Sequence, residues 1–217
     1  MSGANRNIER LRRDYSGEEL AESNVSPDPF KQFLTWFDEA VNAEISDPHA
    51  MVLATASADG RPSARVVLLR GIDGDGLTFY TNYGSRKSLE LEANPRAALV
   101  FPWHELDRQV RVEGNVSRRE DRASDEYFAS RPRASQISAW ASNQSGFLRS
   151  RSELEERFRK FEREFAGRDV PRPENWGGFR LSPESFEFWQ GRPSRMHDRI
   201  LYALLPGGEW KIERLAP

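Results

Sequence analysis

Short apolar segments separated by tight-turn residues make up much of the chain. Residues 50–56 and 64–69 flank the dipeptide Asp59-Gly60, and the turn sequence Asp73-Gly74-Asp75-Gly76 precedes residues 77–81. Aspartate and glycine favour the tight turns that join antiparallel neighbours, because glycine adopts a positive φ without steric cost. The pattern therefore predicts antiparallel hairpins and disfavours alternating βαβ units.

The remaining segments extend this sheet and surround it with helices, so the predicted fold class is mainly β with peripheral helices (α+β), an antiparallel barrel. Further strands are predicted at residues 97–103, 109–116, 178–181, 185–189, 200–204 and 209–214, and helices at residues 85–94, 120–130, 135–141 and 151–165. Because the chain shows neither an internal repeat nor a clear linker, we predict one domain over residues 26–217, preceded by a polar arm over residues 1–25.

Two helices are predicted before the first strand. The first is a short amphipathic helix within residues 5–23, where Ile8, Leu11 and Tyr15 recur at helical spacing. The second begins at Ser26-Pro27-Asp28-Pro29, which supplies capping and first-turn residues. Its apolar stripe, which we expect to face the core, comprises Phe30, Phe33, Leu34, Phe37 and Val41.

Composition and missing motifs argue against several classes of function. The chain has no cysteine and only three histidines, so we expect neither disulfides nor a metal site. Its formal net charge of −2 argues against a general nucleic-acid binder. No apolar run is long enough to span a membrane, and the N-terminus lacks a signal peptide, which predicts a cytoplasmic protein. Rossmann, P-loop and H-E-x-x-H motifs do not occur.

Residues 186–199 combine a tryptophan, three arginines and a histidine directly after an alternating apolar run. Tryptophan offers a flat face, arginine binds phosphate or carboxylate through a planar fork, and histidine exchanges a proton near neutral pH. This mixture suits a ligand with an aromatic ring and an anionic group. An arginine-rich surface loop beside a buried tryptophan would contain the same residues, and the segment alone does not decide between the two.

Two further clusters are typical of anion binding. In one, Arg65 opens a strand while Ser85, Arg86 and Lys87 begin a helix, where backbone N–H groups and the helix dipole favour a phosphate. A solvated basic helix start is the alternative interpretation of that cluster.

The second cluster consists of Tyr127, Arg131 and Ser135, which are spaced four residues apart. Pro132 makes a continuous helix unfavourable, so we predict a helix end followed by a turn. Taken alone, Tyr127 is equally consistent with a half-buried core tyrosine.

Segments spread from about Leu11 to the last residue resemble the pyridoxamine 5′-phosphate oxidase family, FMN enzymes that make pyridoxal 5′-phosphate. The segments follow the family's order, which is more specific than any single motif. Besides residues 186–199, they are residues 65–70, 79–82, 84–87, 101–104, 108–110, 131–137, 139–142, 144–145, 176–179 and 210–217.

The resemblance implies an FMN-binding split barrel in which a homodimer shares two FMN sites at the subunit interface. It implies FMN contacts from Arg65, Val66, Val67, Leu68, Leu69, Arg70, Tyr80, Thr81, Arg86, Lys87, Gln109, Gln144, Ser145, Trp189 and Arg199. Neither a nucleic acid nor a membrane is an expected partner.

The resemblance also implies the reaction. Pyridoxamine 5′-phosphate and pyridoxine 5′-phosphate would be oxidised to pyridoxal 5′-phosphate, with dioxygen as electron acceptor and hydrogen peroxide released. The substrate phosphate would be held by Arg70, Tyr127, Arg131 and Ser135; Arg195 and His197 are the catalytic candidates, and Arg12, Arg13, Asp14 and Tyr15 resemble a mobile segment that covers the site.

The chain departs from the family at Arg70, where lysine is usual. Arginine keeps the charge and adds bidentate geometry, and the chain uses arginine in place of lysine throughout, so we expect the change to be tolerated. Three alternatives to the oxidase remain open: a related flavin oxidase of another ring substrate, of the phenazine-pathway type; a non-catalytic flavin or B6-phosphate binding protein; and a barrel that binds single-stranded nucleic acid.

Overall fold

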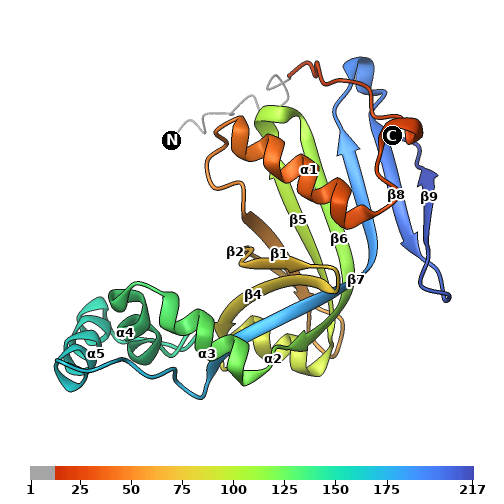
Figure 1. The fold of residues 1–217 in the computed structure, drawn as a ribbon. Coiled ribbons are helices and arrows are strands. Elements are labelled where there is room, and N and C mark those ends of the chain that lie inside the picture. Colours follow the sequence, from red (N-terminus) through yellow and green to blue (C-terminus); the bar gives the residue numbers. More distant parts are fainter. Residues whose placement is uncertain (1–12) are drawn as a thin grey trace, which may run out of the picture. The chain divides into compact units, whose positions relative to one another are not determined.

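The computed structural model describes residues 13–217 (Figure 1). Arg12 and the first part of the predicted N-terminal helix, with Ile8 and Leu11, therefore lie outside the described residues. The chain divides into two compact units. Unit one comprises the described part of residues 1–48 together with residues 102–110 and 186–217, and unit two comprises residues 49–101 and 111–185.

Nine strands, five α-helices and three 3-10 turns are assigned within the described residues. In chain order they are η2 (Glu22–Asn24), α1 (Pro29–Asn42), β1 (Ala50–Ala56), β2 (Pro62–Leu68), β3 (Gly71–Asp73), β4 (Gly76–Asn82), α2 (Arg86–Ala93), β5 (Arg96–Trp103), η3 (His104–Leu106), β6 (Arg108–Arg118), α3 (Asp121–Ser130), α4 (Arg133–Ala141), α5 (Arg151–Glu164), β7 (Trp176–Gln190), η4 (Pro193–Arg195), β8 (Asp198–Leu204) and β9 (Trp210–Arg214). No helix within residues 13–217 has both the length and the apolar character needed to cross a membrane.

All nine strands belong to one sheet with the order β2-β1-β5-β6-β7-β4-β3; β8 also pairs with β7, and β9 pairs with β8. The pairs β1–β2, β1–β5, β3–β4, β4–β7 and β8–β9 are antiparallel. In the first hairpin Leu53 lies opposite Arg65. The antiparallel sheet with peripheral helices that the turn residues predict is thus confirmed.

The fifteen-residue strand β7 replaces the two short strands predicted at 178–181 and 185–189. The sequence Ser182-Pro183 interrupts the alternating pattern, which is why the prediction splits there. In the structure the neighbouring strand β6 carries Gly114, and a Cβ atom at that position would lie 2.1 Å from the Ser182 carbonyl oxygen. The missing side chain lets the two backbones approach, so pairing continues past the proline.

Helix α1 begins as predicted, but its buried face differs from the predicted stripe. Phe33 is fully buried, whereas Leu34 and Val41 are 40% and 48% exposed. The buried face instead includes Trp36 and Ala40, at spacings of three and seven residues from Phe33. Trp36 packs edge-on against Phe188 with 5.2 Å between ring centroids, which shows that tertiary contacts select this face over the neighbouring one.

The predicted N-terminal amphipathic helix is wrong for its described part, because residues 13–21 form no helix. Their backbone N–H groups are used by side chains elsewhere in unit one: Ser16 N–H donates to Asp107 Oδ2 (3.2 Å) and Leu20 N–H donates to Asp198 Oδ2 (3.1 Å). These bonds hold the segment extended, since an amide bonded to a distant carboxylate cannot serve a helix. Tyr15 packs edge-on against Trp189 with 5.6 Å between ring centroids.

Helices α3, α4 and α5 follow one another in unit two (Figure 1). Residues from these helices and from the segment after α5 form a small apolar core. Its buried members are Phe128, Ile137, Phe165, Val170 and Trp176. The Gln136 side chain donates from Nε2 to the carbonyl oxygens of Phe128 (3.0 Å) and Ala129 (3.1 Å), near the end of α3. Phe128 O also accepts from Arg131 N–H (3.2 Å), and Gln136 adds donors to carbonyls at a helix end where Pro132 offers no N–H, so it stabilises the break between α3 and α4.

We predict that the Asp28 cap contributes measurably to stability. Its carboxylate accepts a hydrogen bond of 2.9 Å from Phe30 N–H, an amide that the first turn of α1 leaves unpaired. Asp28→Ala should lower the free energy of unfolding by about 1 kcal/mol. Urea denaturation measures the change, with the exposed Asp38→Ala on the same helix as the control. Equal stabilities of the two variants would contradict a capping role.

Candidate functional site

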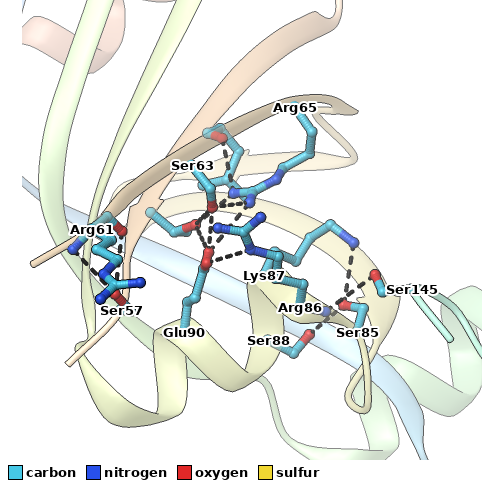
Figure 2. Close-up of polar contacts among 12 residues, drawn as sticks. Ser57, Arg61, Ser63, Arg65, Ser85, Arg86, Lys87, Ser88, Glu90 and Ser145 are labelled. Carbon is cyan, nitrogen blue, oxygen red and sulfur yellow. Dashed lines mark hydrogen bonds and ion pairs between the residues drawn. The ribbon is translucent and has the colours of Figure 1, made fainter. Parts of the chain in front are cut away.

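A basic cavity of about 430 Å³ lies in unit two where β2 faces the start of α2. Its lining residues are Ser63, Ala64, Arg65, Val66, Arg86, Lys87, Gln144 and Ser145. Figure 2 shows the arginine and lysine side chains that β2 and α2 contribute. Arg86 N–H donates to Ser145 Oγ (3.2 Å) in the first turn of α2, where the helix dipole adds positive potential. The predicted convergence of Arg65, Arg86 and Lys87 is present in the structure.

A carboxylate, Glu90, lies beside these cations (Figure 2). Its Oε1 accepts from Arg86 Nε (2.8 Å), and its Oε2 accepts from the hydroxyls of Thr55 and Ser63 at 2.5 Å each. Arg65 Nη2 lies 3.3 Å from the same Oε2. Burial alone would raise the pKa of Glu90, but the hydrogen bonds from Ser63, Thr55 and Arg86 lower it to about 2. Glu90 is therefore ionised at neutral pH.

Lys87 is a buried cation in the same cavity. Its Nζ donates to three neutral oxygens: Thr81 Oγ1 (3.1 Å), Ser85 Oγ (3.2 Å) and Gln144 Oε1 (3.1 Å). Burial lowers the pKa of Lys87 to about 8, and the positive charge of Arg65 acts in the same direction. An anion bound here would reverse both effects, because it supplies the opposite charge that the neutral oxygens do not.

The second cavity, of about 730 Å³, is aromatic on one side and is called the aromatic cavity below. It is lined by Val67, Leu68, Arg70, Tyr80, Thr81, Asn82, Tyr127, Ser130, Arg131, Pro132, Ser135, Ser138, Ala139, Ser142, Gln144 and Trp176. Tyr80 and Tyr127 stack with 3.9 Å between ring centroids and 15° between planes, and Trp176 lies nearly parallel to both. Rings in this arrangement offer an apolar wall for a planar ligand.

Arg131 is the cation of the aromatic cavity. It follows the last residue of α3, and its guanidinium carbon lies 4.6 Å from the centroid of the Trp176 ring. Among the residues that the structure describes, its Nη1 is a buried donor without a hydrogen-bond acceptor. Burial lowers the pKa of Arg131; Tyr127 opposes this shift and Arg70 adds to it. A half-buried guanidinium group with an unused buried donor favours an anionic ligand, since leaving the donor unpaired is costly.

The helix break at Pro132 brings the second predicted cluster together. Tyr127 lies on α3, Arg131 follows the end of that helix, and Ser135 lies on α4. All three line the aromatic cavity together with Arg70. The expectation of a helix end followed by a turn at this proline is confirmed, although the second helix begins at Arg133, two residues earlier than predicted.

Gln144 connects the two cavities because it lines both. Its Oε1 accepts from Thr81 Oγ1 (2.8 Å) as well as from Lys87. Of the predicted cofactor residues in unit two, Val66 lines the basic cavity, and Val67, Leu68, Arg70, Tyr80 and Thr81 line the aromatic cavity. Leu69 lines neither; it is buried, as the alternation along the chain after β2 requires.

The other predicted site residues belong to unit one. Arg13, Tyr15, Gln109 and Trp189 line a third cavity, of about 500 Å³, together with Pro102, His104, Asp107 and Arg108. Arg199 donates from Nε to Glu187 Oε1 (2.8 Å), and this bond raises the pKa of Arg199. Asp14 and Arg195 are exposed.

His197 is held by three neighbours in unit one. Its ring lies 4.7 Å from the Trp189 ring and 5.0 Å from the Tyr15 ring, measured between centroids. Arg192 N–H donates to His197 Nδ1 (3.1 Å). When neutral, the imidazole must therefore carry its proton on Nε2, which becomes a hydrogen-bond donor. Arg195 precedes His197 by two residues. Its φ is 61° and that of Ser194 is 56°, so this loop has two consecutive residues in a left-handed conformation.

Sequence reasoning missed Glu90 and Trp176 as site residues. The signal for Glu90 was its spacing of four residues from Arg86, which favours an ion pair on one helix face. Trp176 was recognised only as part of a family segment, although its ring contacts Arg131. No cluster of three or more potential metal-ligating side chains occurs within residues 13–217.

Two family models match the chain: pyridoxamine 5′-phosphate oxidase over residues 37–166, and the pyridoxine 5′-phosphate oxidase C-terminal dimerisation region over residues 176–217. Two proteins named pyridoxine/pyridoxamine 5′-phosphate oxidase are each 58% identical to it. The protein from Rubrobacter xylanophilus aligns over 99% of this chain and 99% of its own length, and that from Cupriavidus necator over 95% and 97%.

Solved structures are similar as well. PhzG from Burkholderia lata 383, crystallised with tetrahydrophenazine-1-carboxylic acid, has a TM-score of 0.87 at 31% identity and covers 93% of this chain and 100% of its own. A pyridoxamine 5′-phosphate oxidase-related, FMN-binding protein from Nostoc punctiforme has a TM-score of 0.70 at 19% identity, covering 92% and 100%, and shows the fold alone. These likenesses confirm the predicted split-barrel fold class.

We predict that Lys87 makes phosphate binding weaken as pH rises. Its pKa of about 8 means that free Lys87 loses its proton above that pH, whereas a bound phosphate dianion favours the charged form. The Kd for FMN, measured by quenching of flavin fluorescence, should rise between about pH 8 and 9.5. Lys87→Arg should flatten this rise, because its guanidinium stays protonated. An equally steep rise in both proteins would exclude Lys87 as the cause.

Proposed function

The chain belongs to the pyridoxamine 5′-phosphate oxidase family, and on this premise we propose that it oxidises pyridoxamine 5′-phosphate and pyridoxine 5′-phosphate to pyridoxal 5′-phosphate with FMN as its cofactor. One observation carries the proposal: two cationic cavities share Gln144, and one of them holds an arginine with an unpaired buried donor beside aromatic rings. Two adjoining anion sites suit two phosphorylated ligands, a cofactor and a substrate.

The basic cavity fits the phosphate of FMN. Arg65, Arg86 and Lys87 supply cations from two elements, and the start of α2 adds the positive end of the helix dipole. Lys87 in particular is buried among neutral oxygens, so a dianion would satisfy its charge. Held there by Arg65, Arg86 and Lys87, FMN would supply a hydride acceptor for the substrate's 4′ carbon, with dioxygen as the final electron acceptor and hydrogen peroxide as its product.

The aromatic cavity fits the substrate. Arg131 and Arg70 are its cations, and the Tyr127 and Ser135 hydroxyls add hydrogen-bond donors for a phosphate. Arg70 keeps the charge that lysine provides in most of the family. Its backbone N–H bonds to Thr78 O (2.8 Å), which anchors the residue between β2 and β3 while the side chain remains exposed.

Arg195 and His197 are proposed to act on the substrate ring. The hydrogen bond from Arg192 to Nδ1 leaves Nε2–H as the donor of the neutral ring, so neutral His197 would orient an oxygen substituent rather than remove a proton. Arg195 would add a second donor. The proton released during oxidation at the 4′ amine or alcohol would then go to water or to the substrate's own basic groups.

The segment from Arg13 to Leu20 is proposed to cover the site. Asp107 accepts hydrogen bonds from Ser16 N–H and from Arg13, and Tyr15 contacts His197. Within residues 13–217, no backbone–backbone hydrogen bond is found for residues 13–20, so opening would break only side-chain bonds and the packing of Tyr15 and Leu20, and closure would exclude water from the reaction. The proposed role of Arg12 falls outside the described residues.

We further propose a homodimer that shares its FMN sites. Residues 176–217 match the family's C-terminal dimerisation region, and this segment contains Trp189, Arg195, His197 and Arg199. In the shared-site arrangement these residues, together with Gln109, would serve the cavities of the partner subunit.

A phenazine-type flavin oxidase is the second candidate, because PhzG is similar over nearly the whole chain. Its crystallised ligand, tetrahydrophenazine-1-carboxylic acid, carries a carboxylate and no phosphate. The Arg131, Tyr127 and Ser135 cluster beside Arg70 favours a phosphorylated substrate here. Turnover of the two substrate classes by the same purified protein separates the candidates.

The decisive test of the function compares phosphorylated and unphosphorylated substrates. The purified protein should absorb near about 450 nm, as flavoproteins do, and turn over pyridoxamine 5′-phosphate in preference to pyridoxamine. Arg131→Gln should lower kcat/KM for the phosphorylated substrate by about 10- to 150-fold, which corresponds to the about 1.5–3 kcal/mol of a charged hydrogen bond, and spare the unphosphorylated one. Arg122→Gln, an exposed arginine on α3, is the control. Equal losses on both substrates would remove Arg131 from the phosphate site.

We also predict that Arg195 and His197 affect chemistry and not FMN retention. Arg195→Ala and His197→Ala should each slow anaerobic flavin reduction by pyridoxamine 5′-phosphate by about 10²-fold, because the substrate would be misplaced, at unchanged flavin content. This measurement isolates hydride transfer from the oxygen step. Met196 is an exposed residue between them, and the flavin of Met196→Ala should be reduced at the parent rate. Parent rates in both variants would assign the pair a structural role.

A further inference from the structure

A buried carboxylate in a site for anions requires an explanation. Glu90 is only 7% exposed, yet it lies within the basic cavity's group of cations. If the cavity served only to attract phosphate, a negative charge there would weaken it. We propose that Glu90 is a positioning residue that holds Arg65 and Arg86 in the geometry that binds a phosphate dianion, so that the site selects phosphorylated over unphosphorylated flavin. This inference rests on the proposed FMN site.

The geometry supports this role because the two carboxylate oxygens are divided between the two arginines. Oε1 accepts from Arg86 Nε on α2, and Oε2 lies near Arg65 Nη2 on β2 (Figure 2). Thr55 on β1 and Ser63 on β2 donate their hydroxyl protons to Oε2 and hold it in place. One carboxylate thus joins side chains from three separate elements.

Arg65 is fixed by further bonds. Its Nη1 donates to Leu53 O (3.2 Å) and Thr55 Oγ1 (2.5 Å), and its Nη2 donates to Ser63 Oγ. Among the described contacts, Arg86 uses only the Nε–H of its side chain, so both Nη groups remain as donors for a ligand. A guanidinium held at one edge presents its other edge in a fixed direction, which favours bidentate phosphate binding.

The charges match as well. Three cations and one carboxylate give the cavity a net charge of about +2, the opposite of a phosphate monoester dianion near neutral pH. Without Glu90, three neighbouring cations would repel one another and spread apart. The carboxylate therefore favours a clustered arrangement before the ligand arrives, which reduces the ordering cost of binding.

The two effects of Glu90 predict opposite changes in FMN affinity when its charge is removed. Simple Coulomb attraction predicts that Glu90→Gln tightens FMN binding, because the cavity becomes more positive. Positioning predicts weaker FMN binding. Arg86 and Ser63 donate to different oxygens of Glu90, and a glutamine side chain keeps only one oxygen as an acceptor, so one of the two bonds is lost. Riboflavin lacks the phosphate, so its affinity should not respond to positioning of the arginines.

The experiment measures the Kd of FMN and of riboflavin for the flavin-free full-length protein by fluorescence quenching. Glu90→Gln is expected to reduce the preference for FMN over riboflavin by about tenfold or more, entirely through weaker FMN binding. The control is Glu92→Gln, an exposed glutamate on α2 that pairs with Arg118; it should keep both affinities. Thermal unfolding of each flavin-free variant checks that the chain is folded.

An unchanged or increased preference for FMN in folded Glu90→Gln would overturn the positioning role, and so would parallel weakening of both flavins, which indicates a structural role. If that variant does not fold, Ser63→Ala removes one of the bonds that orient Glu90 without changing any charge. It should reduce the preference about threefold, and no change would overturn the proposal. A parent protein that binds both flavins equally would instead contradict the proposed cofactor.

Discussion

The basic cavity depends on the hydrogen bonds and ion pairs of one carboxylate, that of Glu90. It is buried and ionised, and such a group is tolerated only where hydrogen bonds and opposite charges offset its lost hydration. Thr55, Ser63, Arg65 and Arg86 meet this requirement together. Because these residues come from β1, β2 and α2, satisfying one buried charge also sets how the first hairpin and the start of α2 face each other.

The two cavities of unit two use cations differently. In the basic cavity, the arginines share a carboxylate and Lys87 donates to neutral oxygens, so much of the hydrogen-bonding capacity is used within the protein. In the aromatic cavity, Arg131 retains an unused buried donor against the Trp176 ring. The two cavities therefore differ in how much of their donor capacity is used within the protein before a ligand binds.

Gln144 links the two sites. Its Oε1 accepts from Lys87 Nζ and Thr81 Oγ1, which assigns the amide orientation and leaves Nε2 as the donor toward the cavities. A ligand that changes the charge state of Lys87 would therefore also act on a residue of the aromatic cavity.

The sequence by itself determined most elements and their chemistry. The Asp28 cap, the hairpin turns at Gly60 and Gly76, and the break at Pro132 follow from local rules, and the residue types of the phosphate clusters follow from the family resemblance. Tertiary structure decided the rest: which face of α1 is buried, the continuity of β7 through Pro183, and the extended course of residues 13–21. It also placed Glu90 among the cations. These outcomes depend on partners distant in sequence, such as Phe188, Gly114, Asp107 and Thr55, whose positions no local pattern encodes.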